Sequence, residues 1–388
     1  MTVSRIMIVV LLIAALMFVT NAGATAVAED VTFIGSYDTG IASYVAVSGD
    51  YAYVIDETNG LVIVDVSDKK SPEVMGCYDA VEDACSVAIS GNYAYVIDTD
   101  KGLVIVDVSD KEKPVCVGRY DVRGYAHAVV VSGDYAYVAD RSNGLVIVDV
   151  SDKEKPVYVG RYRVARDTYG VAVSDDYAYV AEYDTGLIVV DISNKEQPVL
   201  AGSYNIKGWS VGVAVSGDYA YVANDVSGLT IVDVSDAEAP ELAGNYDATP
   251  NIGVVIVSGD YAYVTDPDRG LMIVDVSDAE APELVGSYDT DGDAHAVAVS
   301  GDYAYVADGG KGLVILHVGT GTTAVATPTR TATAASPETT TTPKMTQTPA
   351  KSATKSATKS AASEGPGFGG VFAVAGLLAI AYLLRRQG

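Results

Sequence analysis

Residues 132–152 read Ser-Gly-Asp-Tyr-Ala-Tyr-Val-Ala-Asp-Arg-Ser-Asn-Gly-Leu-Val-Ile-Val-Asp-Val-Ser-Asp, and variants of this stretch fill most of the 388-residue chain. A fixed period of about forty residues is the signature of a repeat architecture. The first tyrosine of the Tyr-x-Tyr pair recurs every 42 residues, at Tyr51, Tyr93, Tyr135, Tyr177, Tyr219, Tyr261 and Tyr303. We therefore expect one domain built from stacked copies of a single unit.

Each unit contains four short runs rich in Val, Ile and Tyr and bounded by Gly, Asp, Ser and Pro, which predict antiparallel strands. In chain order these are strand A (as at 297–300), strand B (Tyr-Ala-Tyr-Val-Ala), strand C (Gly-Leu-Val-Ile-Val-Asp-Val) and strand D (as at 198–204). Strand C is apolar on both faces, so both faces should be buried. Four-stranded sheets stacked in a ring meet this need, and they predict an all-β β-propeller.

The ends of the array predict how the ring closes. The last strand C is followed by Gly-Thr-Gly-Thr-Thr and by no strand D, whereas a lone D-like segment, residues 31–38, precedes the first unit. A closed ring uses such a segment to complete its last blade and to remove free sheet edges. We therefore expect seven blades of four antiparallel strands, closed by the N-terminal strand.

The Leu-Val-Ile-Val-Asp of residues 61–65, 103–107 and 145–149, with variants at 187–191, 229–233, 271–275 and 313–317, resembles the LVIVD repeat. That repeat is known from predicted surface propellers of archaea and bacteria. The resemblance covers residues 31–318 and implies the propeller fold. It brings no catalytic residues with it.

Residues 1–28 predict a secretory signal peptide. Arg5 precedes an apolar run over residues 6–19, and Ala26-Val27-Ala28 fits the small-residue cleavage pattern. An uncleaved N-terminal anchor is the alternative. The propeller is then expected over residues 29–319.

The predicted propeller is strongly acidic, with 49 Asp and Glu against 17 Lys and Arg in residues 29–319. Such a surface repels nucleic acid and anionic headgroups, so we expect no nucleic-acid partner. It suits contact with salt, divalent cations or basic partners, and it also keeps a secreted domain soluble.

Three cysteines are too few and too scattered for a disulfide framework or a zinc site. Cys77 and Cys116 fall in D strands and Cys85 begins an A strand, so we expect three free and mostly buried thiols and no metal or other cofactor.

Several polar residues recur within the repeat and predict scaffold roles. The strand-C aspartates should accept hydrogen bonds from the following turn. His127 and His295 should each bond a nearby turn or strand-C carboxylate, and His317 takes the place of the strand-C aspartate in the last unit. These aspartates are Asp65, Asp107, Asp149, Asp191, Asp233 and Asp275.

The two faces of the ring should differ. The A–B and C–D turns are nearly alike in all units, whereas the D–A and B–C loops vary and should open on the opposite face. Blades three to five gather basic and aromatic residues there, which on an acidic body predict a ligand-binding patch for carboxylates, sugars or glycan acids. Ordinary loop variation is the alternative. The candidate residues are Arg123, Tyr125, Arg163, Arg166, Tyr169, Lys207 and Trp209.

The acidic B–C loops raise the question of calcium. Asp98-Thr99-Asp100 and Asp266-Pro267-Asp268 offer oxygen ligands, but they lack the span and terminal Glu of a dedicated calcium loop. We expect tight turns closed by the aspartate side chains instead.

The C-terminal part changes character. Residues 320–364 hold 20 Thr or Ser among 45 residues, which predicts an extended, O-glycosylated type of stalk. Residues 365–388 follow with Pro366-Gly367-Phe368, a short apolar run and Arg385-Arg386. This end resembles the PGF-CTERM sorting tail of archaeal surface proteins. The resemblance implies that an archaeosortase removes the tail and that a lipid replaces it; a plain membrane anchor is the alternative.

Three functions fit these observations. The first is a binding or adhesion module on the outer face of the envelope, anchored by its C-terminus, whose partner is a surface glycan or envelope protein. The second is an extracellular propeller hydrolase or lyase, for which Arg166-Asp167 near Tyr169 offers the one weak start. The third is a passive structural component. We expect a binder and not an enzyme.

Overall fold

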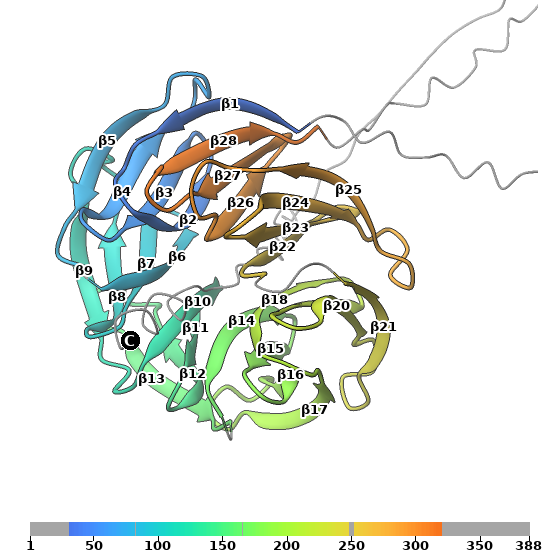
Figure 1. Ribbon diagram of the computed structural model, residues 1–388. Helices are drawn as coiled ribbons and strands as arrows, with labels where there is room; N and C mark the ends of the chain where they lie inside the picture. Colours follow the sequence, from blue (N-terminus) through green and yellow to red (C-terminus); the bar gives the residue numbers. More distant parts are fainter. Residues whose placement is uncertain (1–30, 82, 165, 248–251, 320–388) are drawn as a thin grey trace, which may run out of the picture. The chain divides into compact units, whose positions relative to one another are not determined.

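The computed structural model describes residues 31–81, 83–164, 166–247 and 252–319, which form seven four-stranded antiparallel sheets around a common centre (Figure 1). In each sheet strand A lies near the centre and strand D at the periphery. The predicted seven-bladed propeller is confirmed. The predicted signal peptide, stalk and sorting tail lie outside the described residues, and their boundaries stay predictions.

The 28 strands fall into blades as follows. Blade 1 has β2 (Ala42–Ser48), β3 (Tyr51–Asp56), β4 (Gly60–Asp65) and β5 (Glu73–Tyr78). Blade 2 has β6 (Ala84–Ser90), β7 (Tyr93–Asp98), β8 (Gly102–Asp107) and β9 (Val115–Tyr120). Blade 3 has β10 (Ala126–Ser132), β11 (Tyr135–Asp140), β12 (Gly144–Asp149) and β13 (Val157–Tyr162). Blade 4 has β14 (Thr168–Ser174), β15 (Tyr177–Glu182), β16 (Gly186–Asp191) and β17 (Val199–Asn205). Blade 5 has β18 (Ser210–Ser216), β19 (Tyr219–Asn224), β20 (Gly228–Asp233) and β21 (Glu241–Tyr246). Blade 6 has β22 (Val255–Ser258), β23 (Tyr261–Asp266), β24 (Gly270–Asp275) and β25 (Glu283–Tyr288). Blade 7 has β26 (Ala296–Ser300), β27 (Tyr303–Ala307), β28 (Leu313–His317) and β1 (Thr32–Tyr37).

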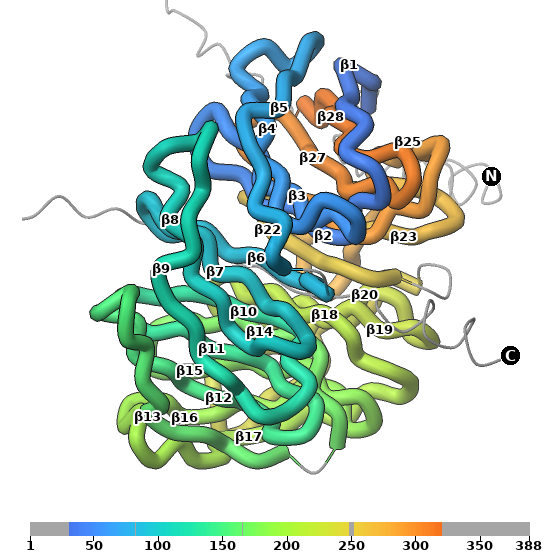
Figure 2. Tube along the Cα trace, turned by 90° about the vertical axis from the view of Figure 1, so that its left-hand side faces the viewer, coloured from blue at the N-terminus to red at the C-terminus, as the bar shows by residue number. Residues whose placement is uncertain are grey.

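The N-terminal strand closes the ring as expected. β1 pairs antiparallel with β28, from Thr32 opposite His317 to Tyr37 opposite Leu313, and the side view shows the two next to each other (Figure 2). The register shifts between Phe33 and Gly35, where the other D strands carry the same irregularity. Thus β1 serves as strand D of blade 7 although it comes first in the chain.

Blades pack through their buried middle strands. Strand C is buried along most of its length in every blade, and the second tyrosine of each Tyr-x-Tyr pair is buried between sheets. On the face of the A–B turns, a lysine from the C–D turn of each of blades 1 to 4 lies over the first tyrosine of the preceding blade. The distance from the ammonium nitrogen to the ring centroid is 5.1 Å for Lys111 over Tyr51 and 4.9 Å for Lys69 over Tyr303. The second contact joins blade 1 to blade 7, where the ring closes. These cation–π contacts add to the apolar stacking of the blades.

The strand-C aspartates cap the turns that follow them. Each accepts a hydrogen bond from the backbone N–H of the serine two residues on, as at Asp107, where the distance from Ser109 N is 2.8 Å. These serine hydrogen bonds hold the pKa of Asp107 below its ordinary value. In blade 7, His317 does the same, since its Nδ1 accepts from Gly319 N at 3.4 Å. The predicted hydrogen bonds from the turn are confirmed.

Candidate ligand-binding face

The variable D–A and B–C loops open on one face, which we call the loop face. Five blades carry a β-bulge here, one residue into strand A, where two residues of strand A oppose one of strand B. A bulge turns the extra side chain away from the regular pleat and is frequent next to functional sites. The bulged residues are Ser43, Cys85, His127, Tyr169 and Val211.

Two of these bulged side chains begin a ladder of aromatic rings that runs across blades 3 to 5. The centroid of His127 lies 5.0 Å from Tyr169, Tyr169 lies 5.6 Å from Tyr183, and Tyr183 stacks on Trp209 at 4.8 Å. His127 and Tyr169 are buried, whereas Trp209 is 41% exposed. The Arg141 guanidinium lies 5.8 Å from the Tyr169 ring and pairs with Asp167. The stacked rings thus hold the exposed indole of Trp209 in place.

The environment of His127 differs from the expectation. Neither ring nitrogen has a hydrogen-bond partner among the described residues, because the bulge directs the imidazole onto Tyr169 and away from turns and carboxylates. Burial lowers the pKa of His127 to about 4, with a further contribution from Arg141. The predicted bond to a turn or strand-C carboxylate is therefore wrong for His127, whose imidazole is neutral at neutral pH. His295 is similar at Nδ1, which also lacks a partner within this part of the chain.

Buried polar side chains form a ring at the ends of the B strands, of which the sequence reasoning recognised Asp98 and Asp266 and missed the others. Each is at most 1% exposed, and most accept backbone N–H groups of the B–C loop, as Asp140 Oδ1 does from Ser142 and Asn143. Burial raises the pKa of Asp140 and of Asp308 above the ordinary value of 3.8. The available signal was a polar residue recurring every 42 residues at the end of an apolar strand. The ring comprises Asp56, Asp98, Asp140, Glu182, Asn224, Asp266 and Asp308.

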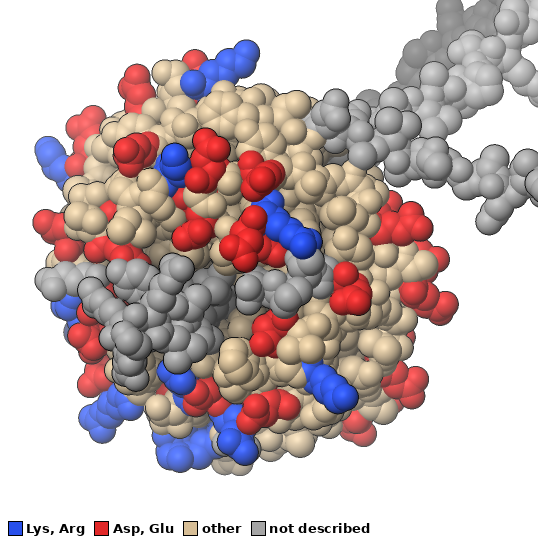
Figure 3. Space-filling model, viewed as in Figure 1, with Lys and Arg blue, Asp and Glu red and all other residues tan. Residues whose placement is uncertain are grey.

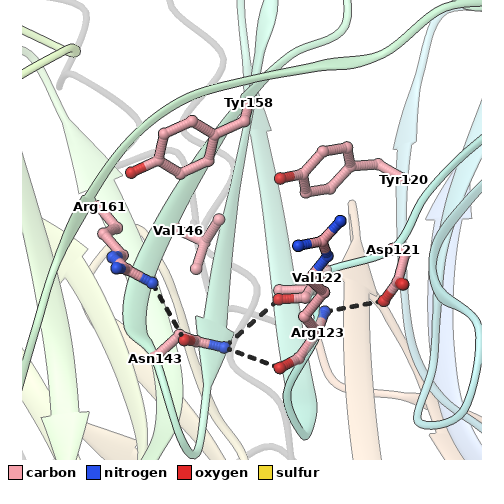
Figure 4. A pocket seen from close by; sticks show the side chains of 8 residues that line it. All are labelled: Tyr120, Asp121, Val122, Arg123, Asn143, Val146, Tyr158 and Arg161. Carbon is pink, nitrogen blue, oxygen red and sulfur yellow. Dashed lines mark hydrogen bonds between the residues drawn. The ribbon is translucent and has the colours of Figure 1, made fainter.

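A groove with a volume of about 540 Å³ lies between blades 2 and 3 and extends from the loop face down the outer wall (Figure 4). Its size falls in the ~300–1,000 Å³ range of small-molecule sites. Figure 4 shows the rings of Tyr120 and Tyr158 on one side, with the guanidinium groups of Arg161 and Arg123 on either side of Val146. The lining residues of this interblade groove are Tyr120, Asp121, Val122, Arg123, Asn143, Val146, Tyr158 and Arg161.

Asn143 connects the two sides of the interblade groove. Its Nδ2 donates to the backbone oxygens of Val122 at 3.3 Å and Arg123 at 3.4 Å, and its Oδ1 accepts from Arg161 Nη1 at 3.3 Å. Asp121 Oδ1 accepts the Arg123 N–H at 2.8 Å. These bonds hold the D–A loop of blade 2 against the B–C loop of blade 3.

Arg123 has an unusual backbone. Its φ is 57°, and Arg123 and Asp175 are the two non-glycine residues with positive φ in the described ranges. Such strain persists where the surrounding structure enforces it and is frequent at ligand sites. A second hollow of about 360 Å³ on the other side of Arg123 is also lined by Asp121, Tyr125 and Asp100.

Comparison with protein families decides the family of the chain. The LVIVD repeat model matches residues 31–80, 82–122, 123–164, 165–206, 207–248, 253–290 and 291–319. The chain belongs to the LVIVD-repeat family. A PGF-CTERM motif matches residues 365–387, which marks this LVIVD-repeat protein as a cell-surface protein of archaeal type, anchored at its C-terminus through archaeosortase processing.

Solved structures agree on the fold. The WD40 repeats of RRP9 align with a TM-score of 0.61 at 12% identity, covering 74% of this chain and 97% of that one. The Cps50 (Swd1) β-propeller domain of Myceliophteria thermophila gives 0.59 at 13%, covering 74% and 99%. BamB from Moraxella catarrhalis gives 0.51 at 16%, covering 71% and 83%. A comparison with curated proteins found no match. At these identities the likeness extends to the propeller fold alone.

The structure divides the predicted basic and aromatic patch into two groups. Arg123 lines the interblade groove together with Arg161, Tyr158 and Tyr120, which were not predicted, whereas Tyr125 lines the second hollow beside Arg123. Trp209 belongs instead to the aromatic ladder, as does Tyr169, which is buried and cannot touch a ligand directly. Arg163, Arg166 and Lys207 are exposed.

The suggested Arg166–Asp167 start for catalysis does not form as an ion pair. Arg166 Nε lies 3.5 Å from Asp184 Oδ2, whereas Asp167 is paired with Arg141. Arg166 and Asp167 are adjacent in the loop before β14, but their side chains contact different B–C loops. Arg166 contacts Asp184 in blade 4, and Asp167 contacts Arg141 in blade 3.

The cysteines and the acidic B–C loops can be compared with their predictions. The three thiols are free, but Cys77 is exposed and Cys85 and Cys116 are half-buried, so the prediction of mostly buried thiols is wrong for Cys77. It lies on the solvent side of an outer strand.

Asp98 and Asp266 close their B–C turns by accepting backbone N–H groups, as expected. Within the described ranges, no three His, Cys, Asp or Glu side chains come together in a way that could hold a metal ion. In the same ranges, no helix has the length and hydrophobicity to cross a membrane.

Proposed function

We propose that this protein is a tethered surface-binding module that engages an envelope glycan or protein through its loop face, between blades 2 and 5. One observation carries the proposal: on a chain of net charge −26, exposed arginines and aromatic rings gather in one sector. In the space-filling view acidic groups spread over the ring, and Lys and Arg lie among them, with several at the lower left edge (Figure 3). Clustered arginine and aromatic side chains are the groups enriched at binding sites.

Binding is favoured over catalysis because three carboxylates of this sector, Asp121, Asp167 and Asp184, are already held by arginine groups. Arg141 pairs with Asp167, Arg166 with Asp184, and Arg161 bonds Asn143. A hydrolase or lyase needs an acid, base or nucleophile within reach of one point, and an unpaired one with a suitable pKa. An enzyme acting on surface polymers and a passive envelope component remain the competing functions.

The test is retention on envelope material from the source cells. We expect the triple variant Arg123→Ala, Arg166→Ala, Trp209→Ala to lose at least about tenfold in retention, because these exposed side chains are the ones proposed to contact the ligand. They lie outside the repeated core, so the variant should keep the native fold. The control triple Lys70→Ala, Lys113→Ala, Lys155→Ala removes exposed cations of the C–D turns on the other face and should bind like the wild type. Equal retention by wild type and loop-face variant, with unchanged circular dichroism, would place binding elsewhere.

The tether is the second part of the proposal. We infer that the tail is removed near Pro366, that a lipid takes its place, and that the stalk of residues 320–364 holds the propeller away from the membrane. The apolar run of the tail is shorter than the ~20 residues that cross a bilayer comfortably, which suits a transient stop better than a permanent span.

If the tail is removed, the mature protein has a lower mass than the unprocessed chain. We expect Phe368→Ala to block removal of the tail, so that a longer form accumulates at the membrane. Phe372→Ala, a matched change outside the Pro-Gly-Phe triplet, should be processed normally. Mass spectrometry of the purified surface form measures both. Recovery of a peptide containing Tyr382 from mature wild-type protein would contradict removal and leave a plain anchor.

A further inference from the structure

The interblade groove combines three chemical features in one hollow. Two tyrosine rings line one side, two guanidinium groups lie across from them, and a carboxylate and an amide complete the wall (Figure 4). Tyr158 is 49% exposed and Val146 is buried beneath the hollow, so a ligand would meet aromatic faces over an apolar floor. Aromatic faces stack on the C–H faces of sugar rings, and guanidinium groups bind carboxylates with two parallel hydrogen bonds.

Other interblade positions lack this combination. Where blade 3 has Tyr158, the other blades have Phe33, Val74, Cys116, Leu200, Leu242 and Leu284. Where blade 3 has Arg161, the others have Ser, Cys, Asn or, in blade 2 alone, Arg119. Arg119 is occupied differently, since its Nη2 donates to the Tyr78 hydroxyl at 2.9 Å. The interblade groove is therefore a departure from the repeat's own pattern.

Asp121 narrows the class of ligand. Its carboxylate lies in the same hollow as Arg123 and Arg161, and it repels a bare anion such as phosphate. A ligand that carries both an anionic group and hydroxyl donors satisfies the arginines and the carboxylate together. Asn143 is held by the backbone oxygen of Val122 and accepts from Arg161, so the position of the Arg161 guanidinium is set before a ligand arrives.

We propose that the interblade groove binds a hexuronic acid residue of a glycan, with its carboxylate on Arg161 and Arg123 and its ring against Tyr158 and Tyr120. This rests on the proposed binding function and names the ligand class and the subsite. An acidic protein segment would use the arginines but would leave the aromatic wall and Asp121 without partners.

The test is calorimetric titration of the full-length protein in detergent with trigalacturonate. The double variant Tyr158→Leu, Arg161→Ser gives blade 3 the residues that blade 4 carries at Leu200 and Ser203, so it should fold. We expect it to weaken binding at least about tenfold, because a charge-assisted hydrogen bond and a stacking face are lost together. Arg119→Gln, on the same strand position one blade earlier, should bind like the wild type.

Two further probes test the chemistry. The trimethyl ester of trigalacturonate keeps the sugar rings and removes the charges, and it should bind at least about tenfold more weakly; binding of the acid should fall with added salt. Hexaglutamate should bind far more weakly than trigalacturonate.

Each outcome bears on the proposal. Tight hexaglutamate binding that falls in the double variant would overturn the saccharide assignment in favour of an acidic protein segment. Equal binding of trigalacturonate by the wild type and the double variant would overturn the assignment of this ligand to the interblade groove. If trigalacturonate does not bind but the protein is retained on envelope material through its loop face, the groove proposal fails and the proposed function stands. Absence of both kinds of binding overturns both.

Discussion

Deletion of residues 29–39 should abolish cooperative unfolding of the propeller. These residues include β1, the strand that pairs with β28 and completes blade 7. Without it, the edge of β28 and the apolar surface between blades 7 and 1 are open to water and to other chains. We expect the single cooperative transition to be replaced by a broad one that begins at a lower temperature. Differential scanning calorimetry and light scattering measure the loss and the aggregation that follows.

A rescue variant separates ring closure from simple loss of sequence. It begins at residue 40 and carries residues 31–39 after His317, joined by a copy of the turn at residues 108–113. This places the same strand in the order that the six other blades use. The rescue variant should recover a single cooperative transition. If the shortened chain already melts like the intact one, closure by β1 does not stabilise the ring.

Gly118→Ala should destabilise the propeller by about 3 kcal/mol, although it adds one methyl group. A Cβ on Gly118 would lie 1.9 Å from the backbone oxygen of Lys153 in the C–D turn of the next blade. Backbone cannot move aside as a flexible side chain does, and overpacking of this kind costs ~1–3 kcal/mol or more. Thermal denaturation should show a melting temperature lower by about 6–12 °C, at roughly 2–4 °C per kcal/mol for a domain of about 150–250 residues.

Gly286→Ala is the matched control, because Gly286 has the same strand position in blade 6. Its added Cβ would meet the side chain of Val31 at 3.0 Å and no backbone. Blade 7 has no C–D turn there, since β1 supplies its fourth strand from the other end of the chain. We expect less than half the destabilisation of Gly118→Ala. Equal losses would mean that the interblade backbone contact is not the cause.

The candidate site was only partly predictable. Arg123 and Tyr125 were recognised as basic and aromatic breaks in the repeat, but Arg161 and Tyr158 lie within a strand and looked like ordinary variation of strand D. Tyr120 and Tyr158 are 38 residues apart and meet because the D strand of one blade flanks that of the next. Tyr169 was wrongly assigned to the surface, since a bulge at its position turns the ring inward onto His127.

The sequence alone was enough for the fold, because the information is local and repeated. The 42-residue period, the double-faced apolar strands and the unpaired D-like segment specify seven blades and their closure without any contact being known. Tertiary structure alone decided which side chains face each other across two blades and which are turned by bulges. Those features depend on how neighbouring sheets stack and on the bulge residue, whose type differs from blade to blade and therefore gives no repeated residue to read in the sequence. The fold could therefore be predicted from the repeat, whereas the groove lined by Arg161 and Tyr158 could be found only in the three-dimensional structure.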